Sequence, residues 1–554
     1  MHTSQGPAAL FTHLLGAHPI IAHFIQRLNL RDIVCSQVGT GRERLIDHGE
    51  ALTALVHNIL DSPAPLYRIA QWADPMAPAS FGFSEEQKKA LNDDRIARML
   101  DALVSERGRG IWFALALRII RQFDLATARM HQDTTTVTFH GGYEQSVGEP
   151  RITRGHNKDH RPDLKQLVFG LTVSSDGAVP VHHQVLSGNR TDDRSHRSNL
   201  EELRQILGTH DFIYVADGKL ATSANLQDIH RHGGKFVTVL PRTRGEDKRF
   251  RQELRQTPVR WKRIMTLPNK RHLDGPPDMF YSCKGLDRTA EGFRLVWIRS
   301  SAKAQHDEAV RERNLEKALM DLAMLQPRLN RRRLKSKKAI QQAVRQILKQ
   351  TATLPFIRIK LTAGFLQQYQ RLKPGRPSAK DPVRVWRRRI WTLKIQRDNK
   401  AVRAEKRTDG VFPLVANMAK AAKRELLSIY KYQPYVEKRF SQIKSDLEVA
   451  PVYLKKALRC AGLVHAYFVA LAVASLMERS VRQGMMRHNI KSLPLLPEGR
   501  STATPTCPRI LEAFRAVSWH EFKRGEEILR FPIKLSSLQK QLLKLLDVPE
   551  GLYR

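Results

Sequence analysis

The order of short apolar strands and helices between residues 131 and 240 most constrains how this chain can fold. It begins with a segment rich in Thr and Val, residues 131–140, which predicts a strand. Two alternating segments, 167–173 and 179–186, flank the turn sequence Ser174-Ser-Asp-Gly177 and predict a hairpin. Helical and strand-like stretches then alternate at residues 196–207, 211–216, 222–231 and 235–240. This order predicts a mixed α/β fold, with helices on the faces of a mixed sheet.

Charge is distributed very unevenly along the 554 residues. The chain has 94 Lys and Arg residues against 54 Asp and Glu residues, a formal net charge of +40. Residues 1–130 contain 14 basic and 13 acidic residues, whereas residues 241–410 contain 44 and 16, a net charge of +28. Such an excess suits a polyanion, because each phosphate contact releases counterions. We therefore expect nucleic acid as the partner.

Apolar content and cysteine spacing limit the class of protein further. Hydrophobic residues make up 41% of the chain, which supports sizeable cores and excludes a wholly disordered protein. The cysteines form no Cys-x-x-Cys pair, which argues against a zinc ribbon and for a reducing compartment. The apolar run 460–477 is long enough to suggest a membrane span, but its Ala content and His465 favour a core helix. We expect a cytoplasmic protein with no signal peptide and no membrane segment.

Composition and patterning divide the chain into five segments. We expect a helical N-terminal domain, the first part of an α/β core, a basic α+β insertion, the second part of the core and a C-terminal helical region, at residues 1–128, 129–241, 242–410, 411–483 and 484–554. Within the insertion, 307–348 predicts a long polar helical stretch, and short strand-like pieces follow it.

Two acidic residues of the α/β core are candidates for chemistry. Asp133 lies within the strand at 131–140, where Asp is disfavoured and a carboxylate needs a partner, a metal or solvent. Asp217 follows the apolar strand 211–216, at the end of a strand where ligand-binding groups gather. Each also has a structural explanation, which is a hydrogen bond to a neighbouring Thr for Asp133 and a helix cap for Asp217.

Glu437 is the third candidate, and it lies in a predicted helix. Tyr430, Gln433, Glu437 and Lys444 are separated by 3, 4 and 7 residues, which places them on one helix face. A hydroxyl, an amide, a carboxylate and an ammonium group then lie together, whereas a core-facing stripe would be apolar. A solvated helix face is the alternative interpretation.

Together, the three carboxylates suggest a metal site. Clustered carboxylates repel one another unless a cation neutralises them. Mg²⁺ prefers oxygen ligands and binds through a few carboxylates, water and substrate phosphates. Two such ions about 3.5–4 Å apart activate a nucleophile and stabilise the leaving oxygen in phosphoryl displacement. The pattern therefore predicts metal-dependent chemistry on a nucleic acid.

These motifs resemble those of the DDE transposases of bacterial insertion sequences. Tyr430, Glu437 and Lys444 match the Tyr-x2-Arg-x3-Glu-x6-Lys signature of the hairpin-forming branch, with Gln433 at the position of the Arg. The first and second acidic motifs of the family are similar to residues 132–136 and 215–219. The stretch 155–166 and Thr408-Asp-Gly410 are also typical of this branch, and the resemblance covers about residues 120–480.

The resemblance implies an RNase H-like core that is interrupted by an insertion. Asp133, Asp217 and Glu437 would bind two Mg²⁺ ions, with Mn²⁺ as a substitute, and Tyr430 and Lys444 would contact DNA phosphates near the cut. It also implies nicking at element ends, hairpin formation by a 3′-hydroxyl and strand transfer. The implied partners are double-stranded DNA, as terminal inverted repeats and target, and a second subunit in a synaptic homodimer. The implied location is the bacterial cytoplasm, at the nucleoid.

Two further expectations concern DNA contacts. Gln433 is expected to face DNA, but it lacks the charge of an Arg, so Gln433→Arg should raise the nicking rate several-fold. Arg331, Arg332 and Arg333 begin a basic run that is expected to contact phosphates or to form a solvated helix face. Two other functions stay open, namely a catalytically idle DNA-binding derivative and an RNase H-like nuclease without strand transfer.

Overall fold

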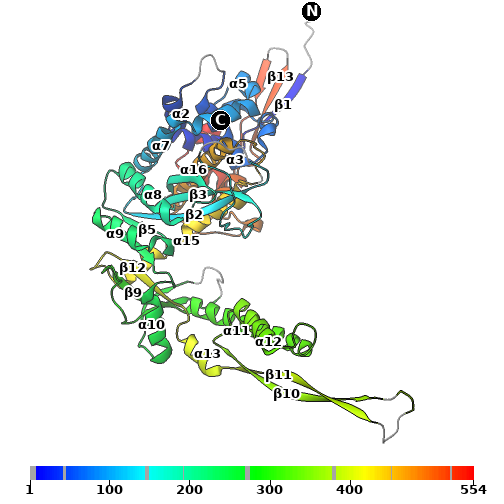
Figure 1. Ribbon diagram of the computed structural model, residues 1–554. Helices are drawn as coiled ribbons and strands as arrows, with labels where there is room; N and C mark the ends of the chain where they lie inside the picture. The colour runs from blue at the N-terminus through cyan, green and yellow to red at the C-terminus, as the bar shows by residue number, and fades with distance from the viewer. Residues whose placement is uncertain are drawn as a thin grey trace, which may run out of the picture. The chain divides into compact units, whose positions relative to one another are not determined.

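The structure is a computed structural model and describes residues 8–40, 45–143, 149–190, 192–268, 275–372, 374–376, 382–450, 452–524 and 527–553 (Figure 1). The chain forms two compact units. The first consists of Met1–Thr238, Ala416–Met418 and Leu426–Arg554, and the second of Val239–Val415 and Ala419–Glu425.

The first unit contains a mixed sheet. Its strands lie in the order β4, β3, β2, β5, β6, with bounds Pro180–Ser187, Lys165–Ser174, Arg129–Phe139, Ile213–Val215 and Lys235–Val239. β3 pairs antiparallel with β2 and β4, whereas β5 pairs parallel with β2 and β6. The predicted mixed sheet and its hairpin are confirmed.

Different helices cover the two faces of this sheet. Helices α15 and α16 lie on one face and α8 on the other, at Pro434–Ser441, Ala457–Arg487 and Asp192–Leu207. The odd-numbered Phe169 of β3 packs against Phe440 of α15, with ring centroids 6.3 Å apart. The even-numbered Thr172 hydrogen-bonds to Asn199 of α8 at 3.1 Å. Because side chains alternate along a strand, odd-numbered residues of β3 face α15.

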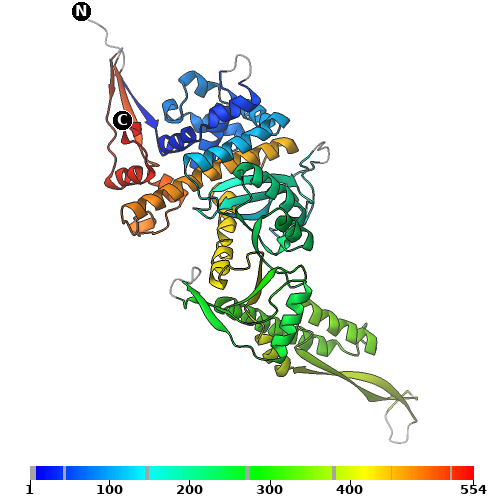
Figure 2. The same cartoon turned by 90° about the vertical axis from the view of Figure 1, so that its left-hand side faces the viewer.

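Helix α16 forms the core of the first unit. It is long and apolar enough to cross a membrane by length and composition, but 94% of its apolar window is buried. It packs against α3, α6 and α18, at His48–Asp61, Asp93–Leu103 and Ser537–Leu546 (Figure 2). The structure therefore agrees with the interpretation of 460–477 as a core helix.

The N-terminal part contains further helices. They are α1, α2, α4, α5 and α7, at His18–Arg27, Leu30–Val38, Ile69–Ala73, Glu85–Ala90 and Arg109–Gln122. Strand β1 (Ala8–Leu14) precedes them and pairs with β13 (Ser518–Arg524), which also pairs with β14 (Glu527–Arg530). None of these three strands was predicted from the sequence, because pairing partners so far apart in the chain leave no local pattern.

The second unit has its own strands and helices. Strands β12, β9, β8 and β7 lie in this order, at Val411–Ala416, Arg294–Ser300, Asp278–Ser282 and Lys262–Leu267. Its helices α10, α11, α12 and α13 span Gly245–Gln256, Ser301–Leu325, Lys337–Gln350 and Asn399–Lys406. The predicted helical stretch 307–348 consists of two helices, since a turn containing Pro327 separates α11 from α12. Arg331, Arg332 and Arg333 lie in this turn and not on a helix.

Strands β10 and β11 form a separate antiparallel ribbon in the second unit. They span Ile357–Arg371 and Val383–Arg397. The sequence predicted only short strand pieces here, because most of the ribbon is exposed and lacks the apolar alternation of a half-buried strand.

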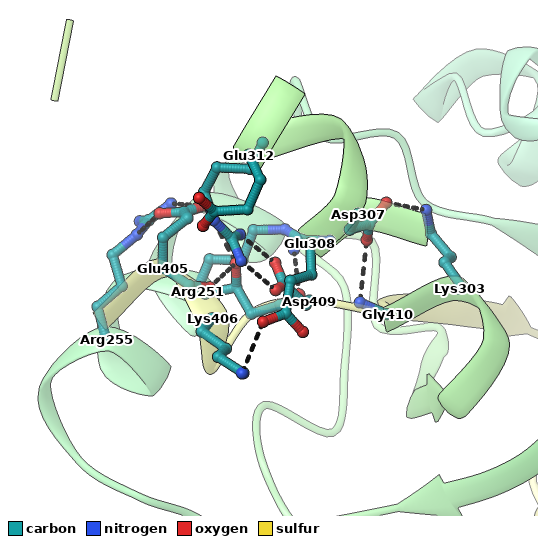
Figure 3. A network of polar contacts seen from close by, with 12 residues as sticks. Arg251, Arg255, Lys303, Asp307, Glu308, Glu312, Glu405, Lys406, Asp409 and Gly410 are labelled. Atoms are coloured by element: carbon teal, nitrogen blue, oxygen red, sulfur yellow. Dashed lines mark hydrogen bonds and ion pairs between the residues drawn. The ribbon is translucent and has the colours of Figure 1, made fainter. Parts of the chain in front are cut away.

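Charged side chains hold the Thr408-Asp409-Gly410 motif inside the second unit (Figure 3). Arg311 forms two hydrogen bonds of 2.7 Å with the carboxylate of Asp409. The backbone N–H of Gly410 donates to Asp307 at 2.9 Å. Gly410 has a φ of +74°, and a Cβ there would lie 2.3 Å from the carbonyl oxygen of Ser300, so only Gly fits. This motif therefore fixes the start of β12.

Candidate active site

Strand register brings Asp133 and Asp217 together. In the parallel pair β2–β5, Arg129 lies opposite Ile213 and His131 opposite Val215. Asp133 and Asp217 each lie two residues beyond the last pair of this register, and the charge of Asp217 acts on Asp133, so the two carboxylates lie near each other. Asp133 pairs with the odd-numbered Leu171 of β3, so its side chain faces the side of the sheet that α15 covers. Asp217 also caps a short turn, since its Oδ1 accepts from the backbone N–H of Lys219 at 3.0 Å.

Asp133 is mostly buried and has a cationic partner. The Nζ of Lys158 lies 3.4 Å from its Oδ1, and the backbone N–H of Thr134 donates to the same oxygen at 2.7 Å. Lys158 also donates to the carbonyl and the hydroxyl oxygen of Thr134. Burial raises the pKa of Asp133 to about 6, and Asp217 contributes to the increase, whereas Lys158 opposes it.

Tyr430 links the first two carboxylates to Glu437. Tyr430 ends α14 (Lys423–Tyr430), and Glu437 lies in the first turn of α15. Burial raises the pKa of Tyr430, and the negative charges of Asp217, Glu437 and Asp133 raise it further. Tyr430 is therefore within electrostatic range of all three predicted carboxylates.

This site has the oxygen ligands that suit a hard cation, but they do not converge as they stand. Among the residues that the structure describes, no group of three or more His, Cys, Asp and Glu side chains is arranged to hold a metal ion. The ammonium group of Lys158 instead neutralises part of the charge on Asp133. The donor chemistry fits Mg²⁺. For all three carboxylates to bind one metal site, their side chains must change conformation so that their oxygens surround the ion.

Gln433 does not face DNA, so the expectation for this residue was wrong. Its side chain is buried, with the residue only 6% exposed. Its Nε2 donates to the carbonyl oxygen of Gln132 at 2.8 Å, and its Oε1 lies 3.3 Å from the Nδ1 of His131. The spacing argument assumed one continuous helix, whereas the chain turns between α14 and α15 just before Pro434. Gln433 therefore joins α15 to β2.

The loop before β3 reaches two of the predicted site residues. Lys158 contacts Asp133, and the adjacent Asp159 pairs with Lys444 at 2.6 Å. Lys444 lies in a π-helical turn, Gln442–Asp446, that follows α15. Sequence reasoning noted the stretch 155–166 but assigned no role to Lys158 or Asp159. The available signal was a pair of opposite charges within a Gly- and Pro-containing loop.

Helix α15 is fixed from its buried side by Arg439. The Nη1 of Arg439 donates to Glu478 of α16 at 2.8 Å, and both side chains are buried. Its Nε and Nη2 donate to the carbonyl oxygens of Ala178 and Gly177, in the turn between β3 and β4, at 2.9 and 2.8 Å. These bonds orient α15, and with it the exposed Glu437, relative to the sheet.

The three arginines expected to contact DNA lie in the second unit. Arg331, Arg332 and Arg333 are exposed in the turn between α11 and α12. Exposed side chains are accessible to DNA, and phosphate contact by these three arginines stays a prediction.

Comparisons with known proteins give limited matches. Residues 11–117 match DUF4277, a domain of unknown function. No curated protein matches the chain. Among solved structures, the chain is similar to one in the cryo-EM structure of the piggyBac transposase synaptic complex with hairpin DNA. The TM-score is 0.38 at 8% sequence identity, and the match covers 90% of this chain and 79% of that chain.

Proposed function

We propose that the protein is a DNA transposase that cuts the ends of its element and joins them to target DNA. One observation carries the proposal. Asp133, Asp217 and Glu437 come from distant segments of the chain, and the negative charges of all three raise the pKa of Tyr430. The strand order β4-β3-β2-β5-β6, with Asp133 on the central strand, supports the RNase H-like core that the family resemblance implies.

Asp133, Asp217 and Glu437 would hold two Mg²⁺ ions, or Mn²⁺ in their place. When bound, such ions supply an activated nucleophile and stabilise the leaving oxygen of a phosphodiester. Tyr430 would act as a neutral hydrogen-bond donor to a phosphate oxygen, since its raised pKa keeps the hydroxyl protonated. Lys158 and Lys444 would bind phosphate oxygens after leaving Asp133 and Asp159.

The DNA partners follow from the same resemblance. We propose terminal inverted repeats as the cleaved DNA, a hairpin intermediate, and a homodimer that holds two ends in a synaptic complex. The bacterial cytoplasm, at the nucleoid, is the location that this function requires.

The test uses the full-length protein and DNA that flanks its reading frame on both sides. In Mg²⁺, the wild type should nick this DNA, whereas Asp133→Asn, Asp217→Asn and Glu437→Gln should each abolish nicking but retain binding. Each change removes a ligand charge without removing a Lys or Arg. Asp211→Asn, at an exposed carboxylate just before β5, is the matched control and should nick normally. If any of these three variants nicks DNA at the wild-type rate, the residue changed in that variant is not a metal ligand.

Two outcomes separate the alternative functions. A wild-type protein that binds flanking DNA but cleaves none in Mg²⁺ or Mn²⁺ is an idle DNA-binding derivative. A protein that cleaves but yields no joint molecules with a plasmid is a nuclease without strand transfer. Presence of all three carboxylates favours activity over the idle derivative.

A further inference from the structure

The outer half of the β10–β11 ribbon lies in solvent on both faces. The two strands pair in register from Ile357 opposite Arg397 to Arg371 opposite Val383. Near the base, Ile357 and Leu393 are buried in the core formed with α11 and α12. Beyond it, residues 365–371 and 383–389 are all exposed, and the ribbon extends away from these helices (Figure 1). At about 3.3 Å per residue, each strand is about 50 Å long.

The charge of this ribbon has one sign. Its two strands contain nine basic residues and no acidic residue: Arg358, Lys360, Arg371, Arg384, Arg387, Arg388, Arg389, Lys394 and Arg397. An isolated pair of strands that buries little apolar surface gains no stability from such charge. The composition therefore indicates a polyanionic partner.

Aromatic rings hold an arginine on each face of the outer half. On one face, Phe365 lies opposite Arg389, whose guanidinium carbon is 5.7 Å from the ring centroid. On the other face, the guanidinium carbon of Arg384 lies 4.5 Å from the ring centroid of Trp386. Cation–π contacts of this kind fix the direction of a guanidinium group without neutralising it. The ribbon thus presents oriented positive charge in two opposite directions.

We propose that the outer half of this ribbon is an arm that enters the major groove of duplex DNA, with the arginines of each face on one of the two phosphate walls. The major groove, about 12 Å wide, admits a two-stranded ribbon, whereas the minor groove is about 6 Å wide. Cations on both faces suit a groove with two anionic walls better than a flat surface. The inference rests on the proposed function only in taking DNA as the polyanion.

Two other occupants fit the ribbon less well. A second copy of the ribbon would bring two pairs of basic strands together with no acidic residue in any of the strands, and charged edges oppose strand pairing. Single-stranded nucleic acid binds by stacking its bases on open aromatic faces. One face of Phe365 and one face of Trp386 already contact an arginine, which leaves fewer open ring faces for stacking.

The first test measures binding of the full-length protein to a duplex oligonucleotide without divalent metal, over a range of salt concentrations. The triple variant Arg384→Gln, Arg387→Gln, Arg389→Gln should bind at least about tenfold more weakly and lower the salt slope by about 0.9 for each lost contact. A matched triple variant on the exposed surfaces of α11 and α12 loses the same charge, by Arg313→Gln, Lys317→Gln and Arg345→Gln. This control should retain most of the affinity. Equal losses in both variants, or tighter binding to a single strand of the same length, overturn the inference.

The second test identifies the groove and separates this inference from the proposed function. Methylation of guanine N7, in the major groove, should interfere with wild-type binding and much less with binding by the ribbon variant, whereas methylation of adenine N3 in the minor groove should not. Interference at adenine N3 alone overturns the inference. If the ribbon variant binds and cuts as the wild type does, the inference fails and the transposase proposal stands. If the wild type cuts no DNA but binds through the ribbon, the transposase proposal fails and the inference about the ribbon stands.

Discussion

The side-chain amide of Gln433 donates a hydrogen bond to the backbone carbonyl of Gln132, the residue before Asp133. At 2.8 Å, this bond joins the start of the glutamate helix to the strand that bears the first carboxylate. Gln433 also lies 3.3 Å from the ring of His131, whose pKa burial lowers to about 4. A neutral His131 and a neutral Gln433 therefore form a buried polar link between two parts of the site.

Gln433→Arg should destabilise the protein instead of speeding up DNA nicking. A buried guanidinium cannot replace the amide as both donor and acceptor, and we expect a cost of about 1–3 kcal/mol. Ser441→Arg places the same residue at an exposed position of α15 and is the control. The measurement is the thermal unfolding midpoint of each variant. A Gln433→Arg protein as stable as the control would show that the buried link adds no stability.

The sequence was sufficient to predict the elements that carry the first two carboxylates. The strands predicted at 131–140 and 211–216 are present as β2 and β5, and the hairpin predicted from 167–173 and 179–186 is present as β3 and β4. The helix at 222–231 also appears, as α9 (Ser223–Arg231). These predictions succeeded because the pattern is local and one face of each element is buried.

The environments of site residues could not be predicted in the same way. The burial of Gln433 depends on where α15 packs, and the contact of Lys158 with Asp133 depends on how a loop folds back over a strand. Neither is encoded in a periodic pattern. The long β10–β11 ribbon was missed because its outer residues are exposed on both faces and show no alternation.

Glu478→Gln should destabilise the protein by about 3–5 kcal/mol. The change leaves the buried guanidinium of Arg439 without its counter-charge, 2.8 Å away in the wild type. Asp547→Asn breaks the exposed pair with Arg487 and should cost less than about 1 kcal/mol. Urea denaturation of both variants gives the comparison. Similar small losses in the two would mean that the buried pair does not anchor α15.

Asp133→Asn should stabilise the metal-free protein at neutral pH. The pKa of this carboxyl is raised from 3.8 to about 6, so the folded state holds its proton more tightly than the unfolded state. Stability from this group is therefore fully present below pH 3.8 and is lost as the pH rises through 6, by at most about 3 kcal/mol. Asn removes that loss.

Unfolding midpoints of wild type and Asp133→Asn should coincide below pH 3.8, separate as the pH rises from 3.8 to about 6, and stay separate above it. Asp211→Asn, at an exposed carboxylate, is the control for the response to Mg²⁺. Addition of Mg²⁺ should raise the midpoint of the wild type much more than that of Asp133→Asn. An equal response to Mg²⁺ in both proteins would show that Asp133 is not a ligand.

Arg331→Gln, Arg332→Gln and Arg333→Gln together should reduce the slope of log affinity against log salt by up to about 0.9 per arginine. All three are exposed in the turn between α11 and α12. The measurement is duplex binding by the full-length protein without divalent metal. An unchanged slope would identify this turn as merely solvated.

Lys158→Met should tighten Mg²⁺ binding and slow DNA cleavage at the same time. The ammonium group lies 3.4 Å from the Oδ1 of Asp133, so it competes with a cation for that oxygen, and Met keeps the length of the chain but not its charge. Mg²⁺ should therefore bind several-fold more tightly, as measured by calorimetry on the DNA-free protein.

The nicking rate depends on a second role of Lys158, which is to contact a phosphate when DNA binds. Met cannot form this charge-assisted hydrogen bond, which is worth about 1.5–3 kcal/mol. Single-turnover nicking should therefore be slower by about tenfold or more, even at saturating Mg²⁺. Lys438→Met removes an exposed charge from α15 and should change neither quantity. Unchanged Mg²⁺ affinity in Lys158→Met would refute the competition, and an unchanged nicking rate would refute the phosphate contact.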